Sequence, residues 1–163
     1  MAVAVASSDL VGCGSDNTPR ADSGGDRCPA PTTDTVREQA ARAAAVLRVT
    51  VREQALLSDG VTTTRGLVAR VDDAIAGSAP ERAAIWPGVD TPSGDELLSR
   101  ETSLVVFVTP HERQTTIDGT TIVGYDISGP NGLLARVPDG LVRVCKAGQS
   151  SPADESVLDG IGS

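Results

Sequence analysis

The sequence has few aromatic residues, few cysteines and a single histidine, and each shortage excludes a class of site. Trp, Tyr and Phe each occur once in 163 residues, so ring platforms that stack bases or sugars are nearly absent. No Gly-x-Ser-x-Gly elbow accompanies the one histidine, His111. The three cysteines contain no Cys-x-x-Cys spacing, which argues against zinc and thioredoxin-like chemistry. We therefore expect neither a cofactor nor a metal.

Positive charge and long apolar runs are also scarce. The formal net charge is -8 and the isoelectric point is near 4.5, so the chain repels phosphate backbones and we expect no nucleic-acid partner. No apolar run approaches the roughly 20 residues that a membrane-spanning helix needs. The length is sufficient for one domain with one core.

The most informative motif present is Leu10-Val11-Gly12 directly before Cys13, followed by a Gly/Ser/Asp/Pro stretch. It resembles the lipobox of bacterial lipoproteins, which implies a diacylglycerol on Cys13, attachment to the plasma membrane through that lipid and an extracytoplasmic location. Residues 1–8 contain no Lys or Arg and Asp9 interrupts the apolar stretch, so we interpret residues 1–13 as a degenerate or truncated signal. The alternative is a chance Val-Gly-Cys in a cytoplasmic protein.

With Cys13 assigned to lipid, Cys28 and Cys145 remain as a candidate pair. In an oxidising compartment they would form a disulfide that ties the start of the folded region to its last strand. The alternative is two unpaired thiols.

The composition divides the chain into four parts. Residues 14–33 are rich in Gly, Ser, Asp and Pro and are predicted to be a flexible, disordered tether after the signal. Residues 34–147 are predicted to form a single β domain with an N-terminal helix, and residues 148–163 a loose tail. A capping-box pattern at Thr35-Val36-Arg37-Glu38 predicts the helix start, and an alanine-rich stripe from Val36 to Leu47 follows at helical spacing.

Downstream, apolar residues alternate and turn signals recur. The hairpin signal Asp59-Gly60 separates a strand over residues 46–57 from a return strand over residues 61–71, with a helix over residues 65–76 as the competing interpretation. Further strands are predicted over 82–86, 104–108, 120–127, 133–137 and 141–145, with turns at Asp118-Gly119, Asn131-Gly132 and Asp139-Gly140. We expect a mainly β fold, a small antiparallel OB-like barrel or a curled meander, because closure hides strand edges.

The order of these pieces resembles a group of proteins from high-GC Gram-positive bacteria. The resemblance covers roughly residues 33–145 and is carried by the long hairpin, Trp86-Pro87-Gly88, the buried strand Leu104–Val108 and the ending Gly129-Pro130-Asn131-Gly132-Leu133-Leu134-Ala135-Arg136-Val137. Those proteins are secreted or lipid-anchored, look like small OB-like barrels and have no assigned reaction. The resemblance therefore implies a fold and a compartment, and supplies no catalytic residues.

Three features of the sequence are candidate sites. His111 follows a strand end and is the base that a hydrolase would need, although a single polar histidine in a loop is usually solvated. The acidic pairs Asp72-Asp73 and Asp95-Glu96 lack the donor pattern of a calcium loop and the aromatic platforms of a glycosidase, and are interpreted as solvated surface. Trp86 is either a core residue or an exposed contact for a partner.

These observations predict a monomeric, non-enzymatic extracytoplasmic module that binds an unknown protein or small ligand. The first alternative is an extracytoplasmic hydrolase that uses His111 or an acidic pair. The second is a cytoplasmic β domain.

Overall fold

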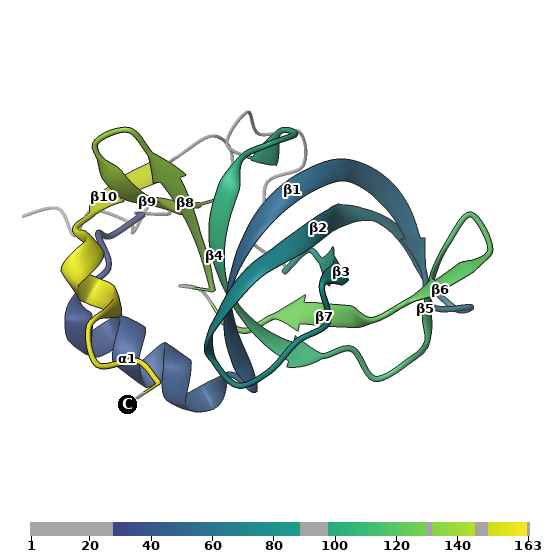
Figure 1. The fold of residues 1–163 in the computed structure, drawn as a ribbon, viewed down its shortest axis with the longest axis horizontal. Coiled ribbons are helices and arrows are strands. Elements are labelled where there is room, and N and C mark those ends of the chain that lie inside the picture. The colour runs from purple at the N-terminus through teal and green to yellow at the C-terminus, as the bar shows by residue number, and fades with distance from the viewer. Residues whose placement is uncertain (1–27, 89–97, 130–131, 146–149, 163) are drawn as a thin grey trace, which may run out of the picture.

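The computed structural model describes residues 28–88, 98–129, 132–145 and 150–162. Strands dominate this part of the chain, and one α-helix precedes them (Figure 1). In chain order the elements are α1 (Thr33–Arg42), β1 (Ala45–Ser58), β2 (Thr63–Ala76), β3 (Arg82–Trp86), β4 (Ser103–Pro110), β5 (Thr115–Ile117), β6 (Thr120–Ile122), β7 (Gly124–Ile127), β8 (Leu133–Val137), β9 (Gly140–Val144), β10 (Ser150–Ala153) and the 3₁₀ helix η3 (Glu155–Leu158).

Five strands close into a barrel in the order β1-β2-β3-β7-β4, because β4 pairs back onto β1. This confirms the prediction of a mainly β, OB-like barrel with one N-terminal helix. The neighbours β3 and β7 run parallel, which differs from the purely antiparallel arrangement expected. The reason is that the chain between them makes a long excursion through β4 and the β5–β6 hairpin before β7 inserts between β3 and β4.

The long β1–β2 hairpin forms one wall of the barrel, and its inner face follows the alternation in the sequence. Leu47, Val49 and Val51 are fully buried in the barrel core. A register shift between Val51 and Glu53 bends the strand, as β-bulges do in small barrels. The competing helix over residues 65–76 is wrong, because these residues pair with β1 throughout.

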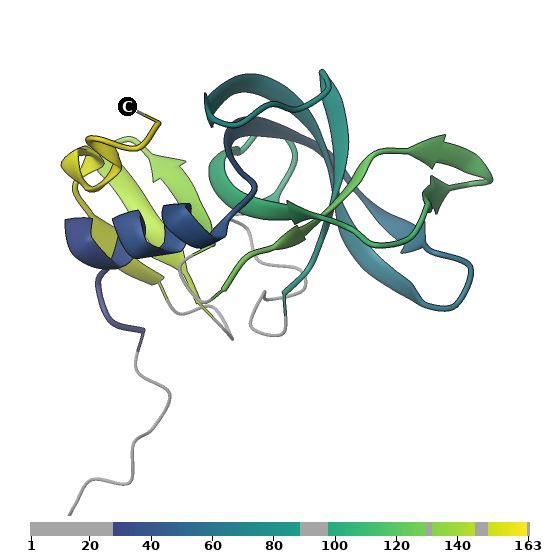
Figure 2. The same ribbon diagram turned by 90° about the horizontal axis from the view of Figure 1, so that it is seen from below.

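A second layer packs beside the barrel. Strands β8, β9 and β10 extend the sheet from β4, and α1 and η3 cover them (Figure 2). Phe107 of β4 and Val36 of α1 are both fully buried in this layer. The helix begins earlier than the capping pattern predicted. Thr32 is the N-cap and forms a capping box with Thr35, so the hydroxyl of Thr35, in the first turn, accepts a hydrogen bond from the backbone amide of Thr32.

The segment predicted as a loose tail differs from that expectation. Residues Ser150–Ala153 pair with β9, and η3 places Val157 and Leu158 in the core between the helices and the sheet. Val157 and Leu158 stand in a Gly/Ser/Pro-rich stretch, so they form no hydrophobic periodicity that would predict a helix or strand. Burial of both side chains nevertheless holds this segment against the sheet. Within the described residues, no helix has the length and hydropathy to cross a membrane.

Cys28 and Cys145 form the predicted disulfide, which spans 117 residues of sequence. The chain beside it is held by further contacts: Ser151 Oγ donates to the Cys28 carbonyl, and Arg143 donates to the Pro29 carbonyl at 2.9 Å. The segment that precedes α1 is therefore fixed to the β9–β10 end of the molecule.

Candidate functional site

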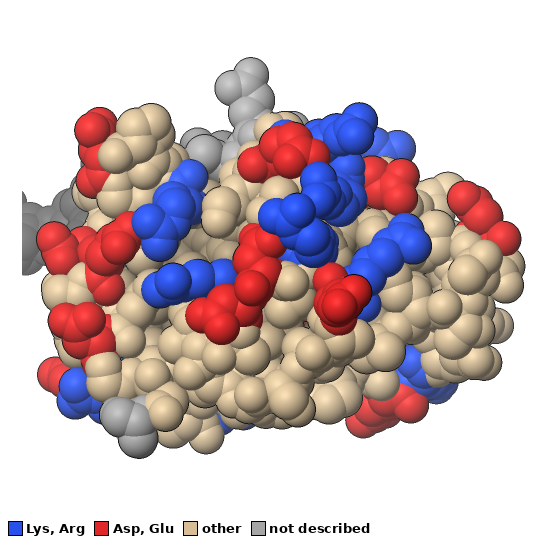
Figure 3. Space-filling view, in the orientation of Figure 1, with Lys and Arg blue, Asp and Glu red and all other residues tan. Residues whose placement is uncertain are grey.

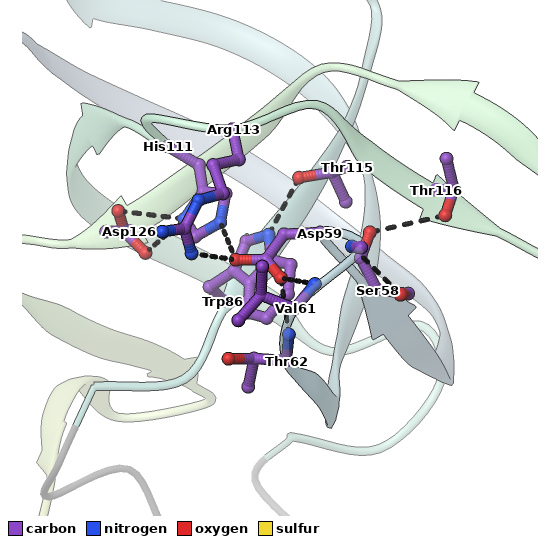
Figure 4. Close-up of polar contacts among 11 residues, drawn as sticks. Ser58, Asp59, Val61, Thr62, Trp86, His111, Arg113, Thr115, Thr116 and Asp126 are labelled. Carbon is purple, nitrogen blue, oxygen red and sulfur yellow. Dashed lines mark hydrogen bonds and ion pairs between the residues drawn. The ribbon is translucent and has the colours of Figure 1, made fainter.

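A polar cluster gathers at the tip of the β1–β2 hairpin, where the sequence predicted only a turn. Asp59 occupies the loop between the two strands, and Gly60 adopts a φ of 82°, which glycine accepts without strain. One carboxylate oxygen of Asp59 accepts hydrogen bonds from the backbone amides of Val61 at 2.8 Å and Thr62 at 2.6 Å (Figure 4). The other oxygen lies 3.2 Å from Arg113 Nη1. The side chain of Asp59 is only 5 % exposed.

His111 lies between two carboxylates, one from the hairpin tip and one from β7. Its Nδ1 is 2.9 Å from Asp126 Oδ1; because a carboxylate only accepts, this hydrogen bond forms in the tautomer that carries a proton on Nδ1. Its Nε2 lies 3.4 Å from Asp59 Oδ2. Nε2 is buried, and no described residue gives it a hydrogen bond of normal geometry. The side chain is 14 % exposed, so the prediction of a solvated loop histidine is wrong.

Trp86 forms the floor of the cluster. Its ring stacks on His111 with centroids 4.2 Å apart and planes 8° apart, and its Nε1 donates to Thr115 Oγ1 at 2.9 Å. Trp86 is 5 % exposed, so the structure shows the core alternative and not an exposed partner contact. Gly124 is required beside it, because a Cβ there would lie 2.1 Å from Thr115 Oγ1.

We name Asp59, Trp86, His111, Thr115 and Asp126 the His111 cluster. Asp59 lies in the β1–β2 loop, Trp86 ends β3, His111 follows β4, Thr115 begins β5 and Asp126 belongs to β7. The cluster therefore joins segments that are far apart in the sequence (Figure 4).

The carboxylates of Asp126 and Asp59 face the two ring nitrogens of His111, and we call this arrangement the clamp. A Ser–His hydrolase needs its nucleophile within hydrogen-bond reach of the histidine. Both ring nitrogens of His111 face carboxylates instead, and among the described residues no hydroxyl or thiol is hydrogen-bonded to the ring.

The carboxyl group of Asp59 makes the clamp sensitive to acid. Hydrogen bonds from the amides of Thr62 and Val61 lower its pKa well below the ordinary range; burial opposes this, and Arg113 and His111 lower it further. A carboxyl whose pKa is lower in the folded state stabilises the fold above its unfolded pKa of about 3.9 and loses that contribution as the pH falls below it.

We therefore expect Asp59→Asn to reduce the free energy of unfolding at pH 7 and to reduce it less as the pH falls below about 4. Urea titrations from pH 7 to pH 2.5 measure this difference. The matched control is Asp118→Asn, in the turn between β5 and β6. A difference between wild type and Asp59→Asn that stays constant down to the lowest pH would contradict the assignment.

Of the acidic pairs singled out in the sequence, the structure describes Asp72-Asp73. Asp72 accepts from Thr50 at 2.6 Å and pairs with Arg70 at 2.6 Å; burial raises its pKa, but the hydrogen bonds from Thr50 and Arg70 outweigh this and leave the pKa lowered. Asp73 is exposed, whereas Asp95, Glu96 and the lipidation candidate Cys13 lie outside the described residues. No group of metal-ligating side chains occurs in the part of the chain that the structure describes.

The fold and the cluster define the protein as a disulfide-linked, OB-like barrel with a clamped loop end. No family model, curated protein or solved structure matches the chain.

Sequence analysis singled out His111 and Trp86 but not their partners. In the sequence Asp59 indicates only a turn, and nothing near Thr115 or Asp126 indicates a contact with His111 or Trp86. Asp59 and His111 are 52 residues apart, and only the closed barrel brings them together. The one indication in the sequence is that the single histidine directly follows Pro110, the last residue of β4.

Proposed function

We propose that the protein is a non-enzymatic binding module held outside the plasma membrane by a lipid on Cys13. The observation that carries this proposal is the Cys28–Cys145 disulfide, since disulfides persist in oxidising compartments and are rare in the cytosol. The lipobox-like sequence before Cys13 and the Gly/Ser/Asp/Pro-rich stretch that follows it agree with the same location.

The clamp supports a binding role for the barrel. OB-fold barrels bind ligands on the face of their second and third strands and on the loops beside it. Here Asp59, in the loop between β1 and β2, accepts a hydrogen bond from Arg113, in the connection after β4, at 3.2 Å. A loop frame that is already ordered loses little conformational entropy when a ligand binds.

The alternatives require features that the proposal does not. A hydrolase based on His111 needs a nucleophile that replaces Asp59 at Nε2. A cytoplasmic protein needs the disulfide to survive a reducing compartment. We therefore place both second to the tethered module.

Detergent phase partitioning of the protein made in its native host from the full locus tests the proposal, with Cys13→Ser as the matched variant. We expect the wild-type protein in the detergent phase, labelled by a radioactive fatty acid, and the variant unlabelled in the aqueous phase. Wild-type protein recovered unlabelled in the cytosol would refute the proposal.

A further inference from the structure

The clamp has a property that depends on the charge of the histidine ring. Nδ1 of His111 lies 2.9 Å from Asp126 Oδ1, and Nε2 lies 3.4 Å from Asp59 Oδ2. A neutral ring carries one N–H group, whereas the imidazolium carries two. Because a carboxylate only accepts, each neutral tautomer leaves one nitrogen lone pair facing a carboxylate. Only the imidazolium can donate to both partners at once.

The contact to Asp59 is the one that a neutral ring leaves incomplete. Nδ1 lies within hydrogen-bond distance of both Asp126 oxygens, at 2.9 Å and 3.1 Å. Nε2 is buried, and among the described residues it has no hydrogen bond of normal geometry. The neutral tautomer with its proton on Nδ1 therefore retains the bond to Asp126 and points a lone pair at Asp59. A buried acceptor without a donor costs free energy, and a proton on Nε2 removes that cost.

The charges that face the ring also favour its protonated form. Asp59 comes from the β1–β2 loop and Asp126 from β7. Among the described residues, Arg113 is the other cation paired with either carboxylate, at 3.2 Å from Asp59 Oδ2. Two carboxylates and one guanidinium leave the group one positive charge short, and the imidazolium supplies that charge. Arg113 is 56 % exposed, whereas His111 is 14 % exposed, so solvent screens the arginine more than the ring.

The other elements packed on the ring add no titratable group. β3 contributes Trp86, whose indole stacks on His111 with centroids 4.2 Å apart, and a cation over an indole face is attracted by the ring quadrupole. β5 contributes Thr115, whose hydroxyl accepts from Trp86 Nε1. Stacking and charge balance therefore act in the same direction.

One side chain of this group changes charge near neutral pH. Histidine titrates between pH 5 and 8, and His111 is the only histidine in the sequence. Asp59 stays ionised in that range, because the amides of Thr62 and Val61 hold its pKa well below the usual value. The surface in Figure 3 carries arginine and acidic side chains over β1 and β2, and these residue types ordinarily keep their charges from pH 5 to 8.

We propose that the clamp is a pH-dependent device: the charged ring of His111 donates from Nε2 to Asp59 and holds the β1–β2 loop to the connection after β4, and loss of that proton releases this contact. The sign follows from the preference for the charged form. Such a contact is fully present below the ordinary histidine value of about 6.5 and is lost as the pH rises above it.

The device joins the two loops that matter for binding in this fold. OB folds bind ligands with the loop between their first two strands and the loop between their fourth and fifth. In this barrel these are the β1–β2 loop and the chain between β4 and β7. The inference thereby deepens the proposed function by naming a regulation of its binding loops, and in that respect it rests on the protein being a binding module.

Hydrogen exchange of the full chain, with Cys28 and Cys145 oxidised, tests the device. The reporters are the amides of Val61 and Thr62, which donate to Asp59. After correction for the intrinsic pH dependence of exchange, we expect their protection to be roughly tenfold higher at about pH 5.5 than at about pH 8, the effect of one charge-assisted hydrogen bond. The internal reference is the amide of Ser156, which donates to the Asp154 carboxylate at 2.8 Å at the N-cap of η3 and should show no such change.

Variants separate the ring from a general effect of pH. His111→Gln and His111→Phe carry no charge at any pH, so the pH dependence should disappear in both. His111→Phe retains a ring beside Trp86 and has no donor, so its protection should match the lower wild-type value throughout. His111→Gln preserves the test if the Phe variant fails to fold. Glu112→Gln removes an exposed charge from the next residue and should retain the tenfold difference.

Three results would overturn the inference: equal protection of Val61 and Thr62 at both pH values, an equal change at Ser156, or a pH dependence that persists in His111→Gln. Failure here is distinguishable from failure of the proposed function. Exchange reports on the clamp wherever the protein resides, and the partitioning experiment reports on the anchor whatever the loops do.

Discussion

The double variant Cys28→Ser/Cys145→Ser is expected to lose roughly 4–5 kcal/mol of unfolding free energy, the largest effect of any change considered. The bond closes a loop of 117 residues, and the chain-entropy treatment gives a stabilisation of this size for loops of that length. Urea denaturation of the oxidised protein and the variant measures the difference. The denaturant slope should also rise in the variant, since the unfolded chain expands without the cross-link.

Cys13→Ser is the matched control for this experiment, because it replaces the third cysteine without touching the bond. It should unfold at the same urea concentration as the wild type. A double variant with an unchanged midpoint would show that the disulfide contributes nothing to the fold, and would remove the structural reason for retaining the pair.

Trp86→Ala is expected to cost about 3–5 kcal/mol, the range for truncation of a large buried aromatic side chain. The substitution removes the ring that stacks on His111 and the donor that satisfies Thr115 Oγ1. Thr115 is 1 % exposed, so its hydroxyl would be left buried without that partner. Thermal and urea denaturation measure the loss.

Trp86→Phe separates packing from hydrogen bonding at the same position. It retains an aromatic ring against His111 and loses the bond to Thr115, so we expect a smaller cost, on the order of 1–3 kcal/mol. The His111 resonances should move in both variants, and further in Trp86→Ala. A cost below about 1 kcal/mol for Trp86→Ala would contradict the packing described for the cluster.

Local chemistry made the strands and turns of this chain predictable. Asp59-Gly60 and Asp118-Gly119 are turns in which both glycines take positive φ, the backbone that the sequence signal implies. The predicted strand over residues 82–86 agrees with β3, and the run Leu104–Val108 is the buried centre of β4. These elements carry their own signals because each is defined by residues close together in the chain.

Long-range pairing was not predictable by the same means. The parallel contact of β3 with β7 depends on the path of the chain between them. The burial of His111 depends on Asp59 and Trp86 arriving from two other segments. The packed chain end depends on Val157 and Leu158 meeting α1. In each case a residue with an ordinary local pattern acquires its environment from a distant element.

The candidate site shows the same division at the level of chemistry. Sequence analysis identified the single histidine and the single tryptophan as residues to examine, and the structure places them in contact. The sequence did not reveal that Arg70 faces Arg82, because the two become neighbours only when β2 pairs with β3. Which like-charged residues face each other across two strands is therefore known only once the register of the strands is known.

The most direct test of the account as a whole is the redox state of Cys28 and Cys145 in intact cells of the native host. Cells are quenched with acid, free thiols are alkylated, and the protein is analysed by mass spectrometry with and without prior reduction. We expect Cys28 and Cys145 to be alkylated only after reduction and to be recovered as one linked pair of peptides. Alkylation of both residues without reduction would contradict it, because the fold would then exist in a reducing compartment without its cross-link.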